Sequence, residues 1–159
     1  MKNFLSFIFE TLKIVIVSLA VVLPIRYFIF QPFIVKGESM EPNFQDGNYL
    51  IIDEISYRFQ GPQRGDVVVF RYPFNPSQRY IKRIIGLPGE TLEINNEKVE
   101  VFDPAGNPMI LKENTYLPAG DVTLGNLKLT LKENEYFVLG DNRLQSSDSR
   151  SWGVLPRDK

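Results

Sequence analysis

The stretch Tyr80-Ile81-Lys82-Arg83-Ile84-Ile85-Gly86-Leu87-Pro88-Gly89 decides the fold, because a predicted strand over 80–85 runs directly into a turn. β-branched and aromatic residues favour extended backbone, and Pro-Gly is typical of a turn. Similar runs, the first two apolar enough to be buried strands, recur between turn residues at 49–52, 66–70, 91–94, 98–102 and 135–139. No long helical periodicity follows residue 35. The sequence therefore predicts a mainly β fold, a hairpin-rich barrel or sandwich.

The expected domain covers residues 33–159. Within it, residues 103–134 are weakly patterned and rich in loop residues, so we interpret them as a variable surface excursion.

Residues 1–32 differ from the rest in composition and predict a membrane anchor. Their uncharged apolar core, 14–25, is shorter than the roughly 20 residues that span a bilayer, so a span would include the turns around Glu10 and Lys13. Two alternatives stay open: a cleavable signal with a weak site at Ser18-Leu19-Ala20, and a buried core helix. Apolar residues continue beyond Ala20, which favours an uncleaved anchor. Lys2 and Lys13 would then lie on the cytoplasmic side, with the catalytic domain extracytoplasmic.

The composition excludes several kinds of chemistry. The 159 residues contain no histidine and no cysteine, so imidazole bases, thiol nucleophiles, disulfides and zinc knuckles are all excluded. We expect no metal and no cofactor. The formal net charge is −1, from 18 basic and 19 acidic residues, which gives no sign of nucleic-acid binding.

Without histidine, a serine nucleophile needs another base, and a lysine held neutral can serve. In the 80–85 strand, alternation places Lys82 on one face with Tyr80 and Ile84. If that face is buried, desolvation lowers the pKa of the lysine toward neutrality. The alternative is a solvent-facing lysine with Ile81 and Ile85 directed inward. The strand alone favours this alternative.

The candidate nucleophile is Ser39, which lies between Gly37 and Pro42 shortly after the predicted anchor. The segment on its own favours the alternative, a serine in an ordinary juxtamembrane turn. A third polar cluster, 140–150, follows the predicted strand 135–139 and contains two acids, two arginines and three serines. Its mixed charges favour Asp–Arg pairing over a metal loop.

Together these segments resemble the bacterial type I signal peptidases, which are membrane-bound Ser/Lys leader peptidases. The motifs occur in the order of that family: an anchor, Ser39-Met40-x-Pro42, then 64–70, 80–90 and 140–150. The resemblance extends from the anchor to residue 156, with 103–134 as its variable part.

The resemblance implies a role for each matching residue. Ser39 would be the nucleophile and Lys82 the general base, with Ser146 orienting the lysine and an Asp148–Arg150 ion pair supporting the loop. The Ser39 backbone N–H would donate to the oxyanion. Gly37 occupies the position where some members have a serine hydroxyl as second donor, so a backbone or water donor would replace it. The pockets for small side chains would be lined by Val35, Met40, Phe44, Tyr80 and Ile81.

Two further departures from the family pattern stand out. Asn43 occupies a position where threonine is frequent, and the family usually continues past residue 159 through another strand and an aromatic-rich tail, so the sequence is either a short member or truncated.

The expected function is removal of N-terminal signal peptides from exported preproteins with small residues at positions −1 and −3. We expect a single-pass protein at the cell membrane that contacts the lipid bilayer, acts as a monomer and binds no nucleic acid. Two alternatives are a Ser/Lys autoprotease of the repressor-cleaving type and a membrane-anchored, non-catalytic β module that binds a partner.

Overall fold

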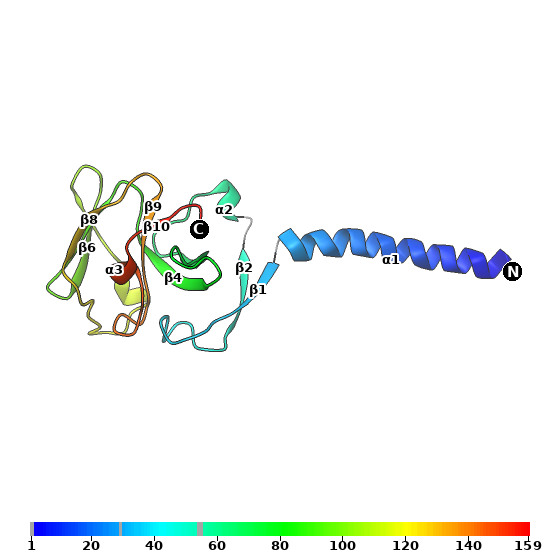
Figure 1. Ribbon diagram of the computed structural model, residues 1–159, viewed down its shortest axis with the longest axis horizontal. Coiled ribbons are helices and arrows are strands. Elements are labelled where there is room, and N and C mark those ends of the chain that lie inside the picture. The colour runs from blue at the N-terminus through cyan, green and yellow to red at the C-terminus, as the bar shows by residue number, and fades with distance from the viewer. Residues whose placement is uncertain (1, 29, 54–55) are drawn as a thin grey trace. The chain divides into compact units, whose positions relative to one another are not determined.

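The computed structural model describes residues 2–28, 30–53 and 56–159, and Figure 1 shows the order of the elements along the chain. The chain divides into two compact units. One comprises residues 1–33 and 49–61, and the other comprises 34–48 and 62–159. Residues 49–61, which the sequence assigns to the domain starting at residue 33, thus belong to the first unit.

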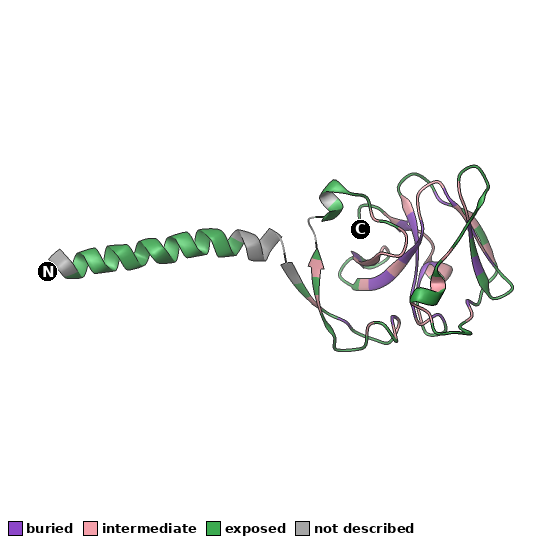
Figure 2. Ribbon diagram, turned by 180° about the vertical axis from the view of Figure 1, so that it is seen from behind, coloured by how far each residue is buried: buried purple, intermediate pink, exposed green. Residues whose placement is uncertain are grey.

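The first unit contains the long helix α1 (Lys2–Phe28), strand β2 (Tyr49–Asp53), the short helix α2 (Ser56–Phe59) and most of β1 (Phe30–Ile34). Within α1, Phe4–Leu23 is apolar and long enough to cross a membrane. Its side chains are exposed (Figure 2), which contradicts the buried core helix kept open above.

The expectation of a buried strand at 49–52 is wrong in one respect. The strand forms, but Tyr49 is 80% and Ile51 71% exposed. The reason is that Tyr49 and Ile51 stand on a two-stranded sheet and belong to neither core cluster that the described residues form.

The second unit contains two antiparallel four-stranded sheets. One has the order β10-β9-β4-β3 and comprises Leu155–Pro156, Glu135–Leu139, Arg79–Gly86 and Val67–Arg71. The other has the order β7-β6-β5-β8 and comprises Pro108–Met109, Lys98–Phe102, Thr91–Asn95 and Leu127–Thr130. The helices of this unit are short: 3-10 helix η1 (Glu113–Thr115) and α3 (Ser149–Trp152).

The main core joins the two sheets. Ile85 of β4 and Phe137 of β9 pack with Leu92 of β5 and Val101 of β6. A second cluster, which includes Ile84 and Val138, covers the other side of the first sheet. The buried strands are visible in Figure 2. The predicted mainly β, sandwich-like fold is therefore confirmed.

Strand β4 is buried on both faces. Ile84 and Ile85 point to different clusters, and each is about 1% exposed. Both open interpretations of this strand are therefore partly right, because Lys82 and the isoleucines are all buried. The register pairs Arg83 with Leu139, so the chain leaves β9 beside Lys82.

Residues 103–134 are more than the expected surface excursion. They include β8, which pairs with β5, and Leu131, which is 2% exposed in the main core. The four-residue alternation of β8 is too short to be distinguished from loop sequence.

Candidate active site

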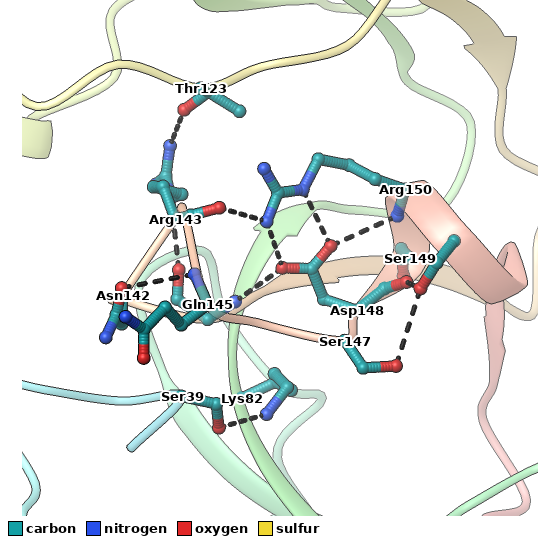
Figure 3. A network of polar contacts seen from close by, with 12 residues as sticks. Ser39, Lys82, Thr123, Asn142, Arg143, Gln145, Ser147, Asp148, Ser149 and Arg150 are labelled. Atoms are coloured by element: carbon teal, nitrogen blue, oxygen red, sulfur yellow. Dashed lines mark hydrogen bonds and ion pairs between the residues drawn. The ribbon is translucent and has the colours of Figure 1, made fainter.

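Ser39 and Lys82 lie together in the second unit. Ser39 comes from the 34–48 segment and Lys82 from β4, and Lys82 Nζ donates a hydrogen bond to Ser39 Oγ at 2.6 Å (Figure 3). The same ammonium nitrogen donates to the Ile81 carbonyl at 2.8 Å. The two residues that the sequence singles out separately are thus within direct reach of proton transfer.

The burial of Lys82 alters its acidity. The side chain is 3% exposed, and this desolvation lowers its pKa from 10.5 to about 8. The negative charges of Asp148 and Asp141 oppose the shift. The Tyr80 ring lies 5.5 Å from Nζ, on the face where alternation places it. An appreciable fraction of Lys82 is therefore neutral near pH 8.

The segment around Ser39 is a turn held by its own backbone and side chains. Val35 N–H donates to Asn48 O and Gly47 N–H donates to Val35 O, both at 2.9 Å. Gly37 has a φ of +86° and donates its N–H to Asp46 Oδ1 at 2.7 Å. This glycine therefore supplies a backbone shape that other residues rarely adopt, and its N–H is already engaged.

The Ser39 backbone is fixed by the loop that follows β9, residues 140–148. Asn142 donates its N–H to Ser39 O and its Nδ2 to Glu38 O, each at 3.1 Å. The Ser39 N–H itself makes no hydrogen bond to any residue that the structure describes. It is available to a ligand atom beside Ser39 Oγ.

Asp148 and Arg150 form the ion pair that the resemblance implies. Arg150 donates from Nε to Oδ1 and from Nη2 to Oδ2, both at 2.8 Å, and Asp148 is completely buried. Asp148 also caps α3 and accepts the Gly140 N–H at 3.1 Å. This carboxylate therefore ties both ends of the 140–148 loop together (Figure 3).

Ser146 is placed close to the nucleophile segment, but it makes no hydrogen bond to Lys82. Its Oγ is buried and has no partner among the described residues. A Cβ added to Gly140 would lie 2.2 Å from Ser146 Oγ and 2.4 Å from Ser39 O. Gly140 thus packs directly against both serines, where no side chain fits.

Arg83, Asp141 and Asn43 form a second polar group that the sequence did not single out. Arg83 binds Asp141 through Nε and Nη2, and Asn43 Nδ2 donates to Asp141 Oδ2 at 2.9 Å. Asn43 also donates to Tyr116 O at 2.7 Å. The available signal for Arg83 was its position next to Lys82, because the side chains of neighbouring strand residues point to opposite faces of the sheet.

The five residues implied to line the substrate pockets differ in burial. Val35, Met40 and Ile81 are buried, whereas Phe44 and Tyr80 are half-buried. The Tyr80 ring is stacked on Tyr72 at 4.6 Å between centroids. Their role as pocket walls stays a prediction.

The chain is similar to proteins of one known family over most of its length. The family model described as "Signal peptidase, peptidase S26" matches residues 8–159. The chain is 36% identical to a probable signal peptidase I-1 of Synechocystis sp., over 96% of this chain and 78% of that protein. It is 37% identical to signal peptidase I of Leptolyngbya laminosa, over 93% and 73% of the two chains. Signal peptidase IB of Staphylococcus aureus is 33% identical, over 91% and 82%.

Proposed function

The chain belongs to the signal peptidase family, peptidase S26, and on this premise we propose that Ser39 is its nucleophile and Lys82 its general base. It is a serine endopeptidase that removes signal peptides from exported proteins. The observation that supports the assignment is the 2.6 Å contact between Lys82 Nζ and Ser39 Oγ in a site where burial lowers the lysine pKa. The match over 8–159 disfavours both a repressor-type autoprotease and a non-catalytic β module.

In the first half of the reaction, neutral Lys82 accepts the Ser39 hydroxyl proton while Oγ attacks the scissile carbonyl carbon. The tetrahedral intermediate collapses as the C–N bond breaks, and the lysine ammonium gives its proton to the leaving amine. The product is an ester between the signal peptide and Ser39, with Lys82 neutral again.

In the second half, Lys82 takes a proton from water, whose oxygen attacks the ester carbonyl. The bond between the carbonyl carbon and Ser39 Oγ then breaks, and Lys82 gives the proton to Ser39 Oγ, which releases the signal peptide with a free carboxyl group and leaves Lys82 neutral. The Ser39 N–H supports the developing oxyanion in both halves, because it is unpaired among the described residues. The Gly37 N–H is bonded to Asp46, so a second donor requires that bond to open or a water molecule to take its place.

The substrate is expected to bind as an added strand, with small residues at −1 and −3 facing the residues around the dyad. Val35, Met40, Phe44, Tyr80 and Ile81 would line the two shallow pockets. The support for this is that Tyr80 and Ile81 directly precede Lys82 on β4 and Met40 follows Ser39 directly.

The apolar helix and the family fit a membrane-anchored enzyme. We further propose a cytoplasmic N-terminus, because Lys2 and Lys13 lie in the N-terminal half of the helix, and an extracytoplasmic catalytic unit. Ser39 follows Pro32 by only a few residues. We expect this short connection to the anchor to keep Ser39 near the membrane surface, where a preprotein would present its cleavage site. The enzyme would act as a monomer.

The test is cleavage of a preprotein with an Ala-x-Ala site, in detergent, by Ser39→Ala and Lys82→Ala variants. Both should lose cleavage. Ser77→Ala and Lys98→Ala, which replace an exposed serine and an exposed lysine, serve as matched controls and should retain it. Full cleavage by either dyad variant would refute the assignment.

A further inference from the structure

Arg143 carries a buried guanidinium group for which the mechanism above has no use. The residue is 2% exposed, and each guanidinium nitrogen is engaged. Nη1 donates to Thr123 Oγ1 (Figure 3). Nε donates to Gly140 O at 3.1 Å and Nη2 donates to Glu113 Oε1 at 2.6 Å. A buried charge is tolerated only when it is paired and hydrogen-bonded, so these partners decide where Arg143 lies.

Two of the three partners come from the 103–134 segment. Glu113 begins η1 and Thr123, itself 2% exposed, lies before β8. Glu113 supplies the one ion pair that Arg143 makes among the described residues. The guanidinium therefore joins this segment to the 140–148 loop.

The third partner, Gly140, leads directly to the nucleophile. Both backbone polar groups of Gly140 are hydrogen-bonded, because its N–H donates to the Asp148 carboxylate and its carbonyl accepts from Arg143. Gly140 packs against Ser39 O, and Asn142 two residues later binds the same carbonyl. A continuous series of contacts thus runs from Glu113 through Arg143 and Gly140 to the Ser39 backbone.

We propose that Arg143 is a positioning residue and that residues 103–134, through Glu113 and Thr123, set the placement of the 140–148 loop against Ser39. The proposal rests on the proposed function of Ser39 and Lys82. Arg143 makes no hydrogen bond to the side chain of either residue. Its loss should therefore lower kcat, leave KM nearly unchanged and leave the pH midpoint of activity in place.

The decisive variant is the double substitution Arg143→Met/Glu113→Gln. It removes both charges together, so no buried charge remains unpaired and the protein should fold. We expect kcat to fall about tenfold or more, because a misplaced catalytic geometry is costly even when binding is intact. A kcat equal to that of the unsubstituted enzyme would overturn the proposal, as would a change confined to KM.

Two more variants keep the test decisive. Thr123→Val removes only the Nη1 acceptor and should lower kcat by a smaller factor, and it replaces the double variant if that one fails to fold. Arg143→Lys should recover part of the activity, because it restores the charge beside Glu113. Glu93→Gln is the matched control, because Glu93 on β5 and Lys128 on β8 form an ion pair at the surface. This variant should leave kcat and KM unchanged.

Ser39→Ala and Lys82→Ala measured in the same assay separate the two proposals. If these variants remain active, the dyad assignment fails. If they are inactive while the Arg143 and Thr123 variants match the unsubstituted kcat, only the positioning role fails.

Discussion

Arg83 binds Asp141 through two hydrogen bonds, from Nε to Oδ1 at 2.8 Å and from Nη2 to Oδ2 at 2.6 Å. Because side chains alternate along a strand, Lys82 faces Ser39 while its neighbour Arg83 faces the loop that follows β9. The Arg83 guanidinium also lies 4.2 Å from the centre of the Tyr116 ring. Strand β4 thus supplies both the proposed base, Lys82, and the residue that binds the loop in contact with the nucleophile, Arg83.

Replacing Asp141 with asparagine should destabilise the folded protein. The Asp141 carboxylate is buried, and its loss leaves the mostly buried Arg83 charge without a counterion. Breaking such a pair costs about 3 kcal/mol of unfolding free energy. The measurement is chemical denaturation in detergent, with Glu93→Gln as the control. That exposed pair should cost less than about 1 kcal/mol, and equal losses in the two variants would contradict the expectation.

The pH dependence of cleavage should follow the pKa of Lys82, which burial lowers to about 8. Below that pH the neutral lysine becomes scarce, and kcat/KM should fall about tenfold for each further pH unit. The negative charge of Asp148 raises this pKa, so Asp148→Asn should move the acid limb to lower pH. The profiles of the two enzymes over pH 5 to 10 check this. An unchanged limb, or a limb at higher pH, would show that another group controls activity.

Lys82→Met should make the protein inactive and more stable. The folded pKa of about 8 lies below the unfolded value of 10.5, so the native state holds the proton less well than the unfolded chain does. This costs about 3 kcal/mol of unfolding free energy in full below pH 8, and the cost vanishes as pH rises toward 10.5. Denaturation of both proteins at pH 7 and pH 10.5 should show a gain at the lower pH only. A gain that is equal at both values would rule out the ionisation of Lys82 as its cause.

Gly140→Ala should abolish most activity. The new methyl group would lie 2.4 Å from Ser39 O and as close to Ser146 Cβ, so the loop must move away from the nucleophile. A displacement of this size costs about 100-fold in kcat. Gly61→Ala is the control, because that position has open space and an ordinary backbone angle. Steady-state cleavage and a denaturation curve for each variant separate misplacement from unfolding, and a Gly140→Ala enzyme as active as the control would contradict this reading of the contact.

Six strands could be predicted because their signal is local, whereas β1, β7, β8 and β10 were missed. The bounds 98–102 and 135–139 agree with β6 and β9, and the other predicted strands differ by one residue at either end. Alternation also identified the residues that share a face with Lys82, but it could not show that both faces of the strand are covered. That depends on packing across the whole fold, because β5 and β6 cover Ile85 while Phe70 and Leu155 lie with Ile84 in the second cluster.

The site was less accessible to sequence reasoning. Reasoning from the residues named Ser39 and Lys82 only as separate candidates, and the family resemblance was needed to pair them, since no local pattern predicts that a turn and a strand meet. Asp141 illustrates the difficulty. The nearest arginine along its own loop is Arg143, yet Asp141 pairs with Arg83, and Arg143 pairs with Glu113. The choice of ionic partner is made by tertiary packing, and only the structure reveals it.

The bond from Asn142 to Glu38 spans 104 residues of chain. Closing so large a separation is entropically unfavourable, so such contacts form only after the strands between them have assembled. A chain still being synthesised therefore carries Ser39 in a turn that has only its own local hydrogen bonds and lacks the contacts of the 140–148 loop. On the proposed mechanism it stays inert until the 140–148 loop has been made and folded, so the protease acquires its activity only after a segment about 100 residues beyond the nucleophile has been synthesised.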